Sequence, residues 1–153
     1  MEEAIIEAKK AASEDEVPVG AVIVRNGEII ARAHNTREAT QNAVNHAEIL
    51  AIAQACGAVG SWRLDECELY VTLEPCPMCA GAIVNSRLFG VHFGAYDMKA
   101  GCVETVYKLL EGRFNHKPKV IEGGVMESEC AALLSEYFSA KRTEQKMKKS
   151  QSD

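Results

Sequence analysis

The 153-residue sequence predicts an α/β protein in which helices cover both faces of a mixed β-sheet. Two observations support this prediction. Apolar segments at 19–25 and 28–34 are separated only by Asn26 and Gly27, a strong signal for an antiparallel hairpin. Further along, strand patterns alternate with helical patterns, which indicates strands joined by right-handed crossovers. We therefore expect a three-layer α/β/α sandwich.

The first helix is predicted at residues 2–13. Its apolar residues, Ile5, Ile6, Ala8 and Ala12, form one stripe along the helix. Such a stripe is typical of a helix that packs against a sheet.

After the hairpin, a loop at 34–45 leads to a helix that begins at His46. The order of the later elements follows from apolar runs and from the Gly and Pro residues between them. These elements are a buried strand at 68–73, a helix at 76–87, a strand at 88–94, a short helix around 104–110, an extended segment at 119–123 and a last helix at 127–142.

Three potential metal ligands and one acid form an HxE…PCxxC pattern. His46, Cys76 and Cys79 are the kinds of ligand that zinc prefers. Three protein ligands leave one coordination position open, which is typical of catalytic zinc rather than structural zinc. Zinc lowers the pKa of bound water to about 7, and Glu48 is then available to move protons. We predict one catalytic zinc per chain with Glu48 as the catalytic residue.

The cysteines also allow two other interpretations. Cys76 and Cys79 could form a redox pair, or a fourth ligand could close a structural zinc site. The candidates for that fourth ligand are His34, Cys56, Cys67, His92, Cys102 and Cys130. Neither interpretation accounts for Glu48 or Pro75, so the catalytic zinc is preferred.

Composition restricts the class of protein. No apolar run approaches the roughly 18 residues of a membrane helix, and the acidic N-terminus lacks the apolar stretch of a signal peptide. We therefore expect a cytoplasmic protein with no membrane partner and no disulfides. The net charge is −5, but residues 139–153 carry +3 and leave −8 on the rest. This basic run is either a solvated helix end or a contact for RNA backbone.

The HxE…PCxxC pattern is the signature of zinc nucleobase deaminases. Longer segments resemble those of the bacterial tRNA-specific adenosine deaminases, in the cytidine and deoxycytidylate deaminase superfamily. These segments are EVPVGAVIV, NHAE, LYVTLEPCPMCAGAIVNSR, GCVETVYKLL and ECAALLSEYF. The resemblance implies a cytidine deaminase-like fold with a five-stranded sheet, a deaminase domain of the CMP/dCMP type at 1–140, and a basic tail at 141–153. It also implies a homodimer, and we expect the apolar segment 91–96 and the segments that flank the helix at 76–87 to pack between subunits.

The resemblance further implies hydrolytic deamination of the wobble adenosine in a tRNA anticodon stem-loop to inosine. Hydroxide from zinc-bound water would attack C6 of adenine while Glu48 carries the protons. The backbone N–H of Ala47 could stabilise charge on the reacting oxygen. By resemblance Asn35 contacts the base, and Asp97 and Lys99 approach the neighbouring nucleotides; an ordinary turn residue and solvated loop charges are the alternatives.

Two other functions stay open on the sequence alone. The same zinc site could deaminate a free nucleobase or nucleotide, such as guanine, cytosine or dCMP. The chain could also be a noncatalytic zinc or RNA-binding module, but Glu48 argues against this.

Overall fold

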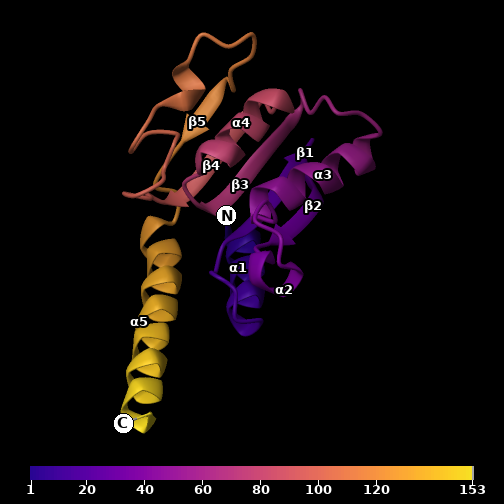
Figure 1. The fold of residues 1–153 in the computed structure, drawn as a ribbon. Helices are drawn as coiled ribbons and strands as arrows, with labels where there is room; N and C mark the ends of the chain where they lie inside the picture. The colour runs from indigo at the N-terminus through magenta and orange to yellow at the C-terminus, as the bar shows by residue number, and fades with distance from the viewer. Residues whose placement is uncertain (153) are drawn as a thin grey trace.

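The computed structural model describes residues 1–152 as a three-layer α/β/α sandwich, as predicted (Figure 1). Its strands are β1 (Gly20–Arg25), β2 (Glu28–His34), β3 (Cys67–Leu73), β4 (Gly90–Ala95) and β5 (Val120–Glu122). Its helices are α1 (Glu2–Ser13), α2 (Arg37–Thr40), α3 (Ala47–Val59), α4 (Pro77–Asn85), the 3₁₀ helix η1 (Leu109–Glu111) and α5 (Glu127–Gln151).

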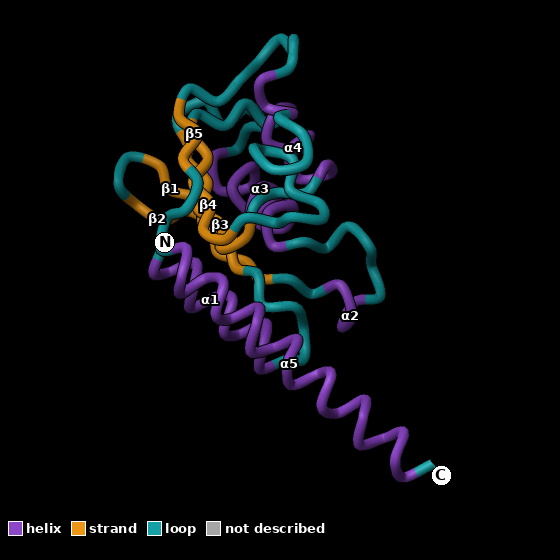
Figure 2. Tube along the Cα trace, turned by 90° about the vertical axis from the view of Figure 1, so that its left-hand side faces the viewer, coloured by secondary structure: helices purple, strands orange, loops and turns teal. Residues whose placement is uncertain are grey.

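The five strands form one mixed sheet in the order β2-β1-β3-β4-β5. β1 is antiparallel to β2 and β3, whereas β3, β4 and β5 are parallel. Figure 2 shows α1 and α5 on one side of the sheet and α3 and α4 on the other. No helix in residues 1–152 is long and apolar enough to cross a membrane.

The hairpin forms where the sequence predicts it. Arg25 pairs with Glu28, so only Asn26 and Gly27 make the turn. Their φ angles are 52° and 78°, the left-handed values that a type I′ turn requires. A local turn signal therefore fixes the register of the first two strands.

The main core lies between the sheet and the pair α3 and α4. Leu69, Val91 and Phe93 point into it from the central strands, and Ala51 and Ile83 pack against them from the two helices. Every residue of β4 is buried, as expected for a parallel strand covered on both faces. The segment 91–96 is therefore buried within its own chain apart from Tyr96, so only Tyr96 of this segment is open to the dimer contact expected from the sequence.

The predicted stripe on α1 is partly wrong. Ile5 and Ala8 are buried, but Ile6 is 46% exposed and Ala12 lies in solvent. The buried face is centred instead on alanines, because α1 lies very close to β1. A Cβ atom on Gly20 would collide with the backbone of α1, so small residues are needed on both sides of this contact.

Three element boundaries differ from the predictions. Helix α4 begins at Pro77, so Cys76 becomes its N-cap residue and Pro75 stays outside the helix. The short helix expected at 104–110 is reduced to η1. The last helix does not end near residue 142 but continues to Gln151, so the basic residues extend it as exposed turns that project from the body (Figure 1).

Candidate active site

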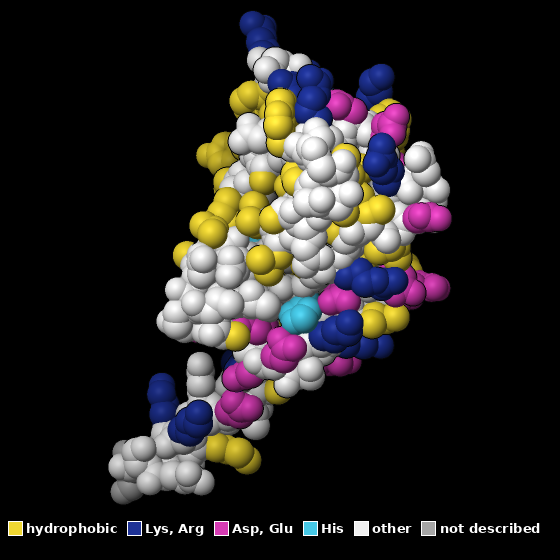
Figure 3. Space-filling view, turned by 90° about the vertical axis from the view of Figure 1, so that its right-hand side faces the viewer, with side chains coloured by type: hydrophobic (Ala, Val, Ile, Leu, Met, Phe, Trp, Pro, Cys, Tyr) yellow, Lys and Arg dark blue, Asp and Glu magenta, His cyan; other side chains and the backbone are white. Residues whose placement is uncertain are grey.

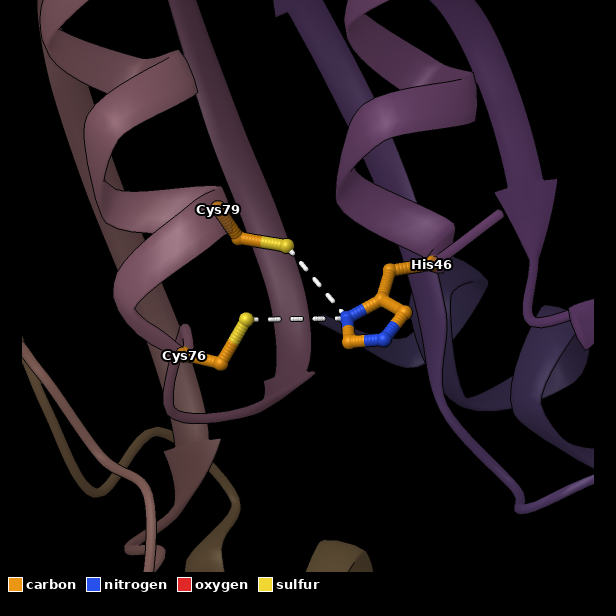
Figure 4. Close-up of side chains that lie close together, drawn as sticks. All are labelled: His46, Cys76 and Cys79. Atoms are coloured by element: carbon orange, nitrogen blue, oxygen red, sulfur yellow. Dashed lines mark hydrogen bonds between the residues drawn. The ribbon is translucent and has the colours of Figure 1, made fainter. Parts of the chain in front are cut away.

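The starts of two helices meet beside the C-terminal end of β3. His46 is the N-cap residue of α3, and Cys76 is the N-cap residue of α4. Helix α3 leads through a loop to the start of β3, and α4 follows the end of β3 directly. Both helices therefore begin at the end of the sheet where β3 ends. Figure 4 shows that Cys79, in the first turn of α4, points with Cys76 towards the imidazole of His46.

The geometry of these three side chains fits a zinc ion. The Sγ atoms of Cys76 and Cys79 both lie 3.6 Å from Nδ1 of His46. In a tetrahedral zinc site with ordinary bond lengths, sulfur and nitrogen ligands stand roughly 3.5–3.6 Å apart. Within residues 1–152, these three are the only group of three or more His, Cys, Asp or Glu side chains close enough to share a metal.

The electrostatics of the cluster also favour a cation. The Cys79 thiol donates a hydrogen bond to Cys76, and this, with a second one from His46, lowers the pKa of Cys76 to about 4. The same interaction with Cys76 raises the pKa of Cys79 above its ordinary value. Without a metal, Cys79 therefore keeps its proton beside a Cys76 thiolate, and only one of the two sulfurs is ionised. A divalent cation resolves this competition, because it stabilises both thiolates together with a neutral imidazole.

Glu48 lies in the first turn of α3 and is only 4% exposed. Burial in this apolar setting raises the pKa of its carboxyl group, although hydrogen bonding from Cys79 and the charge of His46 oppose the shift. A carboxyl group with a raised pKa exchanges protons more readily near neutral pH than an ordinary glutamate does. Its position is therefore suited to general acid–base chemistry.

A cavity of about 160 Å³ opens over the cluster. Three of the four residues predicted to bind substrate, Asn35, Ala47 and Asp97, line this cavity, whereas Lys99 is exposed outside it. The other residues that line it are Val17, Val19, Arg37, His46, Glu48, Leu73, Glu74, Cys76 and Ala100.

Two of the predicted residues present unpaired polar groups at the cavity. Asn35 is 7% exposed, yet its side-chain amide makes no hydrogen bond to another described residue. Ala47 is the first residue of α3, so its backbone N–H has no acceptor within the helix. Both groups are therefore free to bind a molecule in the cavity.

Asp97 has a structural role as well. Its Oδ1 accepts hydrogen bonds from the backbone N–H groups of Lys99 and Ala100, at 3.0 and 3.1 Å. These bonds close a tight turn at the wall of the cavity. The sequence predicted the position of Asp97 near substrate, but it gave no sign of this turn.

Two charged residues of the cavity wall were not predicted. Arg37 reaches the cavity from α2, whose start is held by buried Glu16 through the backbone N–H groups of Glu38 and Ala39. Glu74 lies beneath the opposite wall. Burial alone would raise the pKa of Glu74, but hydrogen bonds, chiefly from Glu104 and Thr105, lower it below its ordinary value. The only signal for Glu74 in the sequence was its position immediately before the PCxxC segment.

Comparisons with known proteins agree with this site. The chain matches the MafB19-like deaminase family over residues 1–140. It is 58% identical over 147 residues to the tRNA-specific adenosine deaminase of Bacillus subtilis (strain 168), an alignment that covers 95% of this chain and 91% of that protein.

Two solved structures resemble the chain. One comes from studies of A-to-I editing by tRNA:A34 deaminases at the wobble position of transfer RNA. It superposes with a TM-score of 0.84 at 43% identity and covers 88% of this chain and 97% of that one. A guanine deaminase from Bacillus subtilis superposes less closely, with a TM-score of 0.60 at 32% identity over 69% of this chain and 78% of that one.

Proposed function

The chain belongs to the MafB19-like deaminase family and to the tRNA-specific adenosine deaminases, and from this premise we propose that it converts the wobble adenosine of a tRNA anticodon to inosine. One observation carries the proposal: buried Glu48 lines the same cavity as His46 and Cys76, two members of the cluster that Cys79 completes. An acid beside three metal ligands is expected of a hydrolase and has no purpose in a structural zinc site. We also propose a cytoplasmic location, which the similarity to bacterial tRNA-specific adenosine deaminases supports.

The residues of the site divide the chemistry between them. His46, Cys76 and Cys79 would hold one zinc per chain, which when bound makes water nucleophilic near neutral pH. The carboxylate of Glu48 accepts a proton from the attacking water and delivers it to a ring nitrogen of adenine. Glu48 then takes the proton that remains on the added hydroxyl group and supplies it to the amino group that leaves C6, so ammonia departs and the base becomes hypoxanthine.

The remaining residues orient the base and its neighbours. The backbone N–H groups of Ala47 and Cys76 are placed to orient the attacking oxygen and stabilise its charge. The amide of Asn35 can both donate to and accept from a base edge, and its lack of a partner supports this role. Asp97 at the cavity and Lys99 outside it would approach the flanking nucleotides.

A comparison of substrates tests the proposed function. We expect inosine and ammonia from an anticodon stem-loop with adenosine at the wobble position, and little product from free adenosine, cytidine or guanine. Anticodon loops present unstacked bases, and flanking nucleotides supply binding energy that a free base lacks. Mass spectrometry of nucleosides after incubation measures the products. Turnover of guanine with an inert stem-loop would instead favour the function of the guanine deaminase that the chain resembles.

We also propose that the protein is a homodimer. The segment 91–96 is buried within its own chain apart from Tyr96, so we expect a dimer contact to use other apolar side chains as well. Large ones are exposed in loops, including Trp62, Met98 and Tyr107 at 59%, 77% and 70%. Figure 3 shows hydrophobic side chains over much of the upper part of one face. Such surfaces often pack between subunits.

Analytical ultracentrifugation checks this prediction. We expect a species of twice the 16.7 kDa chain mass at micromolar concentration. A protein that sediments only as a single chain at all working concentrations is not a dimer.

The projecting end of α5 is proposed to contact RNA backbone. Lys141 is paired with Asp15 and Glu144 and thus fastens the helix to the body. The cations beyond it form no ion pair with another described residue; these are Arg142, Lys146, Lys148 and Lys149. Figure 3 shows Lys and Arg side chains on this projecting part of the molecule.

Deletion of residues 142–153 should therefore weaken tRNA binding and reduce its dependence on salt. Each lost phosphate contact lowers the slope of log K against log salt concentration by about 0.7–0.9. The deletion leaves Lys141 and its ion pair with Asp15 in place, so zinc content should not change. Binding measured by fluorescence anisotropy between 50 and 200 mM salt decides the matter, because an unchanged slope means that the tail is only a solvated helix end.

A further inference from the structure

One buried carboxylate, that of Glu74, accepts hydrogen bonds from the backbone of an entire loop. Glu74 is 2% exposed and accepts five hydrogen bonds, all from the segment 97–105, which we call the pocket loop. Four come from backbone N–H groups and the fifth from the Thr105 hydroxyl. The four backbone bonds are from Glu104 at 2.8 Å, Thr105 at 3.0 Å, Val103 at 3.1 Å and Asp97 at 3.2 Å.

The loop fits tightly around this carboxylate. A Cβ atom on Gly101 would collide with the Glu74 carboxyl group and with the backbone oxygen of Asp97. The backbone N–H of Cys102 donates to the carbonyl oxygen of Pro75 at 2.8 Å. The pocket loop is thus fastened to residues 74 and 75, immediately before the metal ligand Cys76.

The part of the loop at the cavity depends most on Glu74. Cys102 and Val103 are also held by apolar packing in the core. The hydrogen bonds of residues 97–100 stay within the loop, with one exception, the bond from the Asp97 N–H to Glu74. Asp97 and Ala100 line the cavity from this segment. Without Glu74, this wall of the cavity would lose its only polar link to the metal-binding turn.

We propose that Glu74 is a positioning residue that holds the pocket loop in the shape needed to capture the target nucleotide. Its carboxylate is occupied by donors of the pocket loop and it is not one of the three metal-binding residues, so it acts through the position of Asp97 and Ala100. A loop that is already ordered before substrate binds loses no further conformational entropy on binding. Loss of Glu74 is therefore expected to weaken binding of the nucleotide more than it slows the reaction of the bound nucleotide. The identity of that nucleotide, an anticodon adenosine, rests on the proposed function.

Two substitutions test the proposal from opposite sides of the contact. Glu74→Gln keeps the shape of the side chain but presents N–H donors to neighbours that are nearly all donors. Gly101→Ala leaves the carboxylate unchanged and pushes the loop away from it. Gly57→Ala is the matched control, because a Cβ atom there meets nothing within 4 Å and the residue lies on the exposed side of α3. Thr105→Val, which removes only the hydroxyl donor, is a milder variant should Glu74→Gln not fold.

Three measurements are made on each full-length, zinc-loaded protein: KM and kcat on the anticodon stem-loop, zinc content, and amide hydrogen exchange. We expect Glu74→Gln and Gly101→Ala to raise KM at least about 10-fold and to change kcat less than about 3-fold. The amides of Asp97, Val103, Glu104 and Thr105 should exchange at least about 10-fold faster. Gly57→Ala should match the wild type, and every variant should keep one zinc.

The proposal fails if amide exchange accelerates while KM stays unchanged, because the shape of the loop would then not govern capture. It also fails if Gly101→Ala loses zinc, since Glu74 would then support the metal rather than substrate. Failure of the proposed function looks different: the wild type itself would not turn over the stem-loop, and the exchange data would still report whether Glu74 holds the loop.

Discussion

Replacement of Glu48 by alanine is expected to lower turnover of the anticodon stem-loop by at least about 100-fold. Glu48 is the only carboxyl group of the cavity that lies beside the three metal ligands and is not already used by backbone N–H groups. No other described residue is therefore placed to carry protons between water, the ring nitrogen and the leaving amine. Single-turnover measurement of inosine formation gives the size of the effect.

The Glu48 variant should still contain one zinc per chain, because its side chain is not one of the three ligands. Glu48→Gln offers an isosteric check, since it keeps the volume of the side chain and removes only its ability to carry protons. Glu66→Gln is a suitable control, because its carboxylate forms an exposed ion pair with Arg25 far from the cavity. Full activity in Glu48→Ala would overturn the mechanism.

Replacement of either cysteine ligand should remove the metal and the activity together. A serine hydroxyl does not ionise near neutral pH as a thiol does beside zinc, so Cys76→Ser and Cys79→Ser each leave two good ligands. We expect less than about a tenth of the wild-type zinc after dialysis against a chelator, and at least a 100-fold loss of deamination. Metal analysis of the purified proteins measures the first effect and product formation the second.

Cys56→Ser separates loss of a ligand from loss of any cysteine. Cys56 is a partly buried free thiol on α3, outside the cluster, and its substitution should preserve both zinc and activity. Retention of zinc by both Cys76→Ser and Cys79→Ser would show that the cluster is not the metal site. Loss of zinc without loss of activity would show that the metal is not catalytic.

Features of this protein that depend only on residues close together in the sequence could be predicted from the sequence alone. Asn26 and Gly27 specify the hairpin because their backbone angles suit only one kind of turn between two strands. The ligands were predictable for a related reason. Spacing by three places Cys76 and Cys79 in adjacent positions at one helix start, and the chemistry of thiols and imidazole restricts the metal. The arrangement of layers followed from the alternation of strands and helices.

Contacts between distant residues decided the rest. A helix was expected at 104–110, but there the amides of Glu104 and Thr105 bond to Glu74, about thirty residues earlier, and only the short 3₁₀ helix η1 follows. Close packing of α1 on Gly20 similarly left Ile6 in solvent. The sequence indicated the three metal-binding residues and predicted the acid, whereas only the tertiary structure showed that Glu74 accepts hydrogen bonds from the pocket loop. A buried carboxylate needs hydrogen-bond donors, and the fold can supply them from residues that are distant in the sequence. A local sequence pattern therefore cannot predict which residues these donors are.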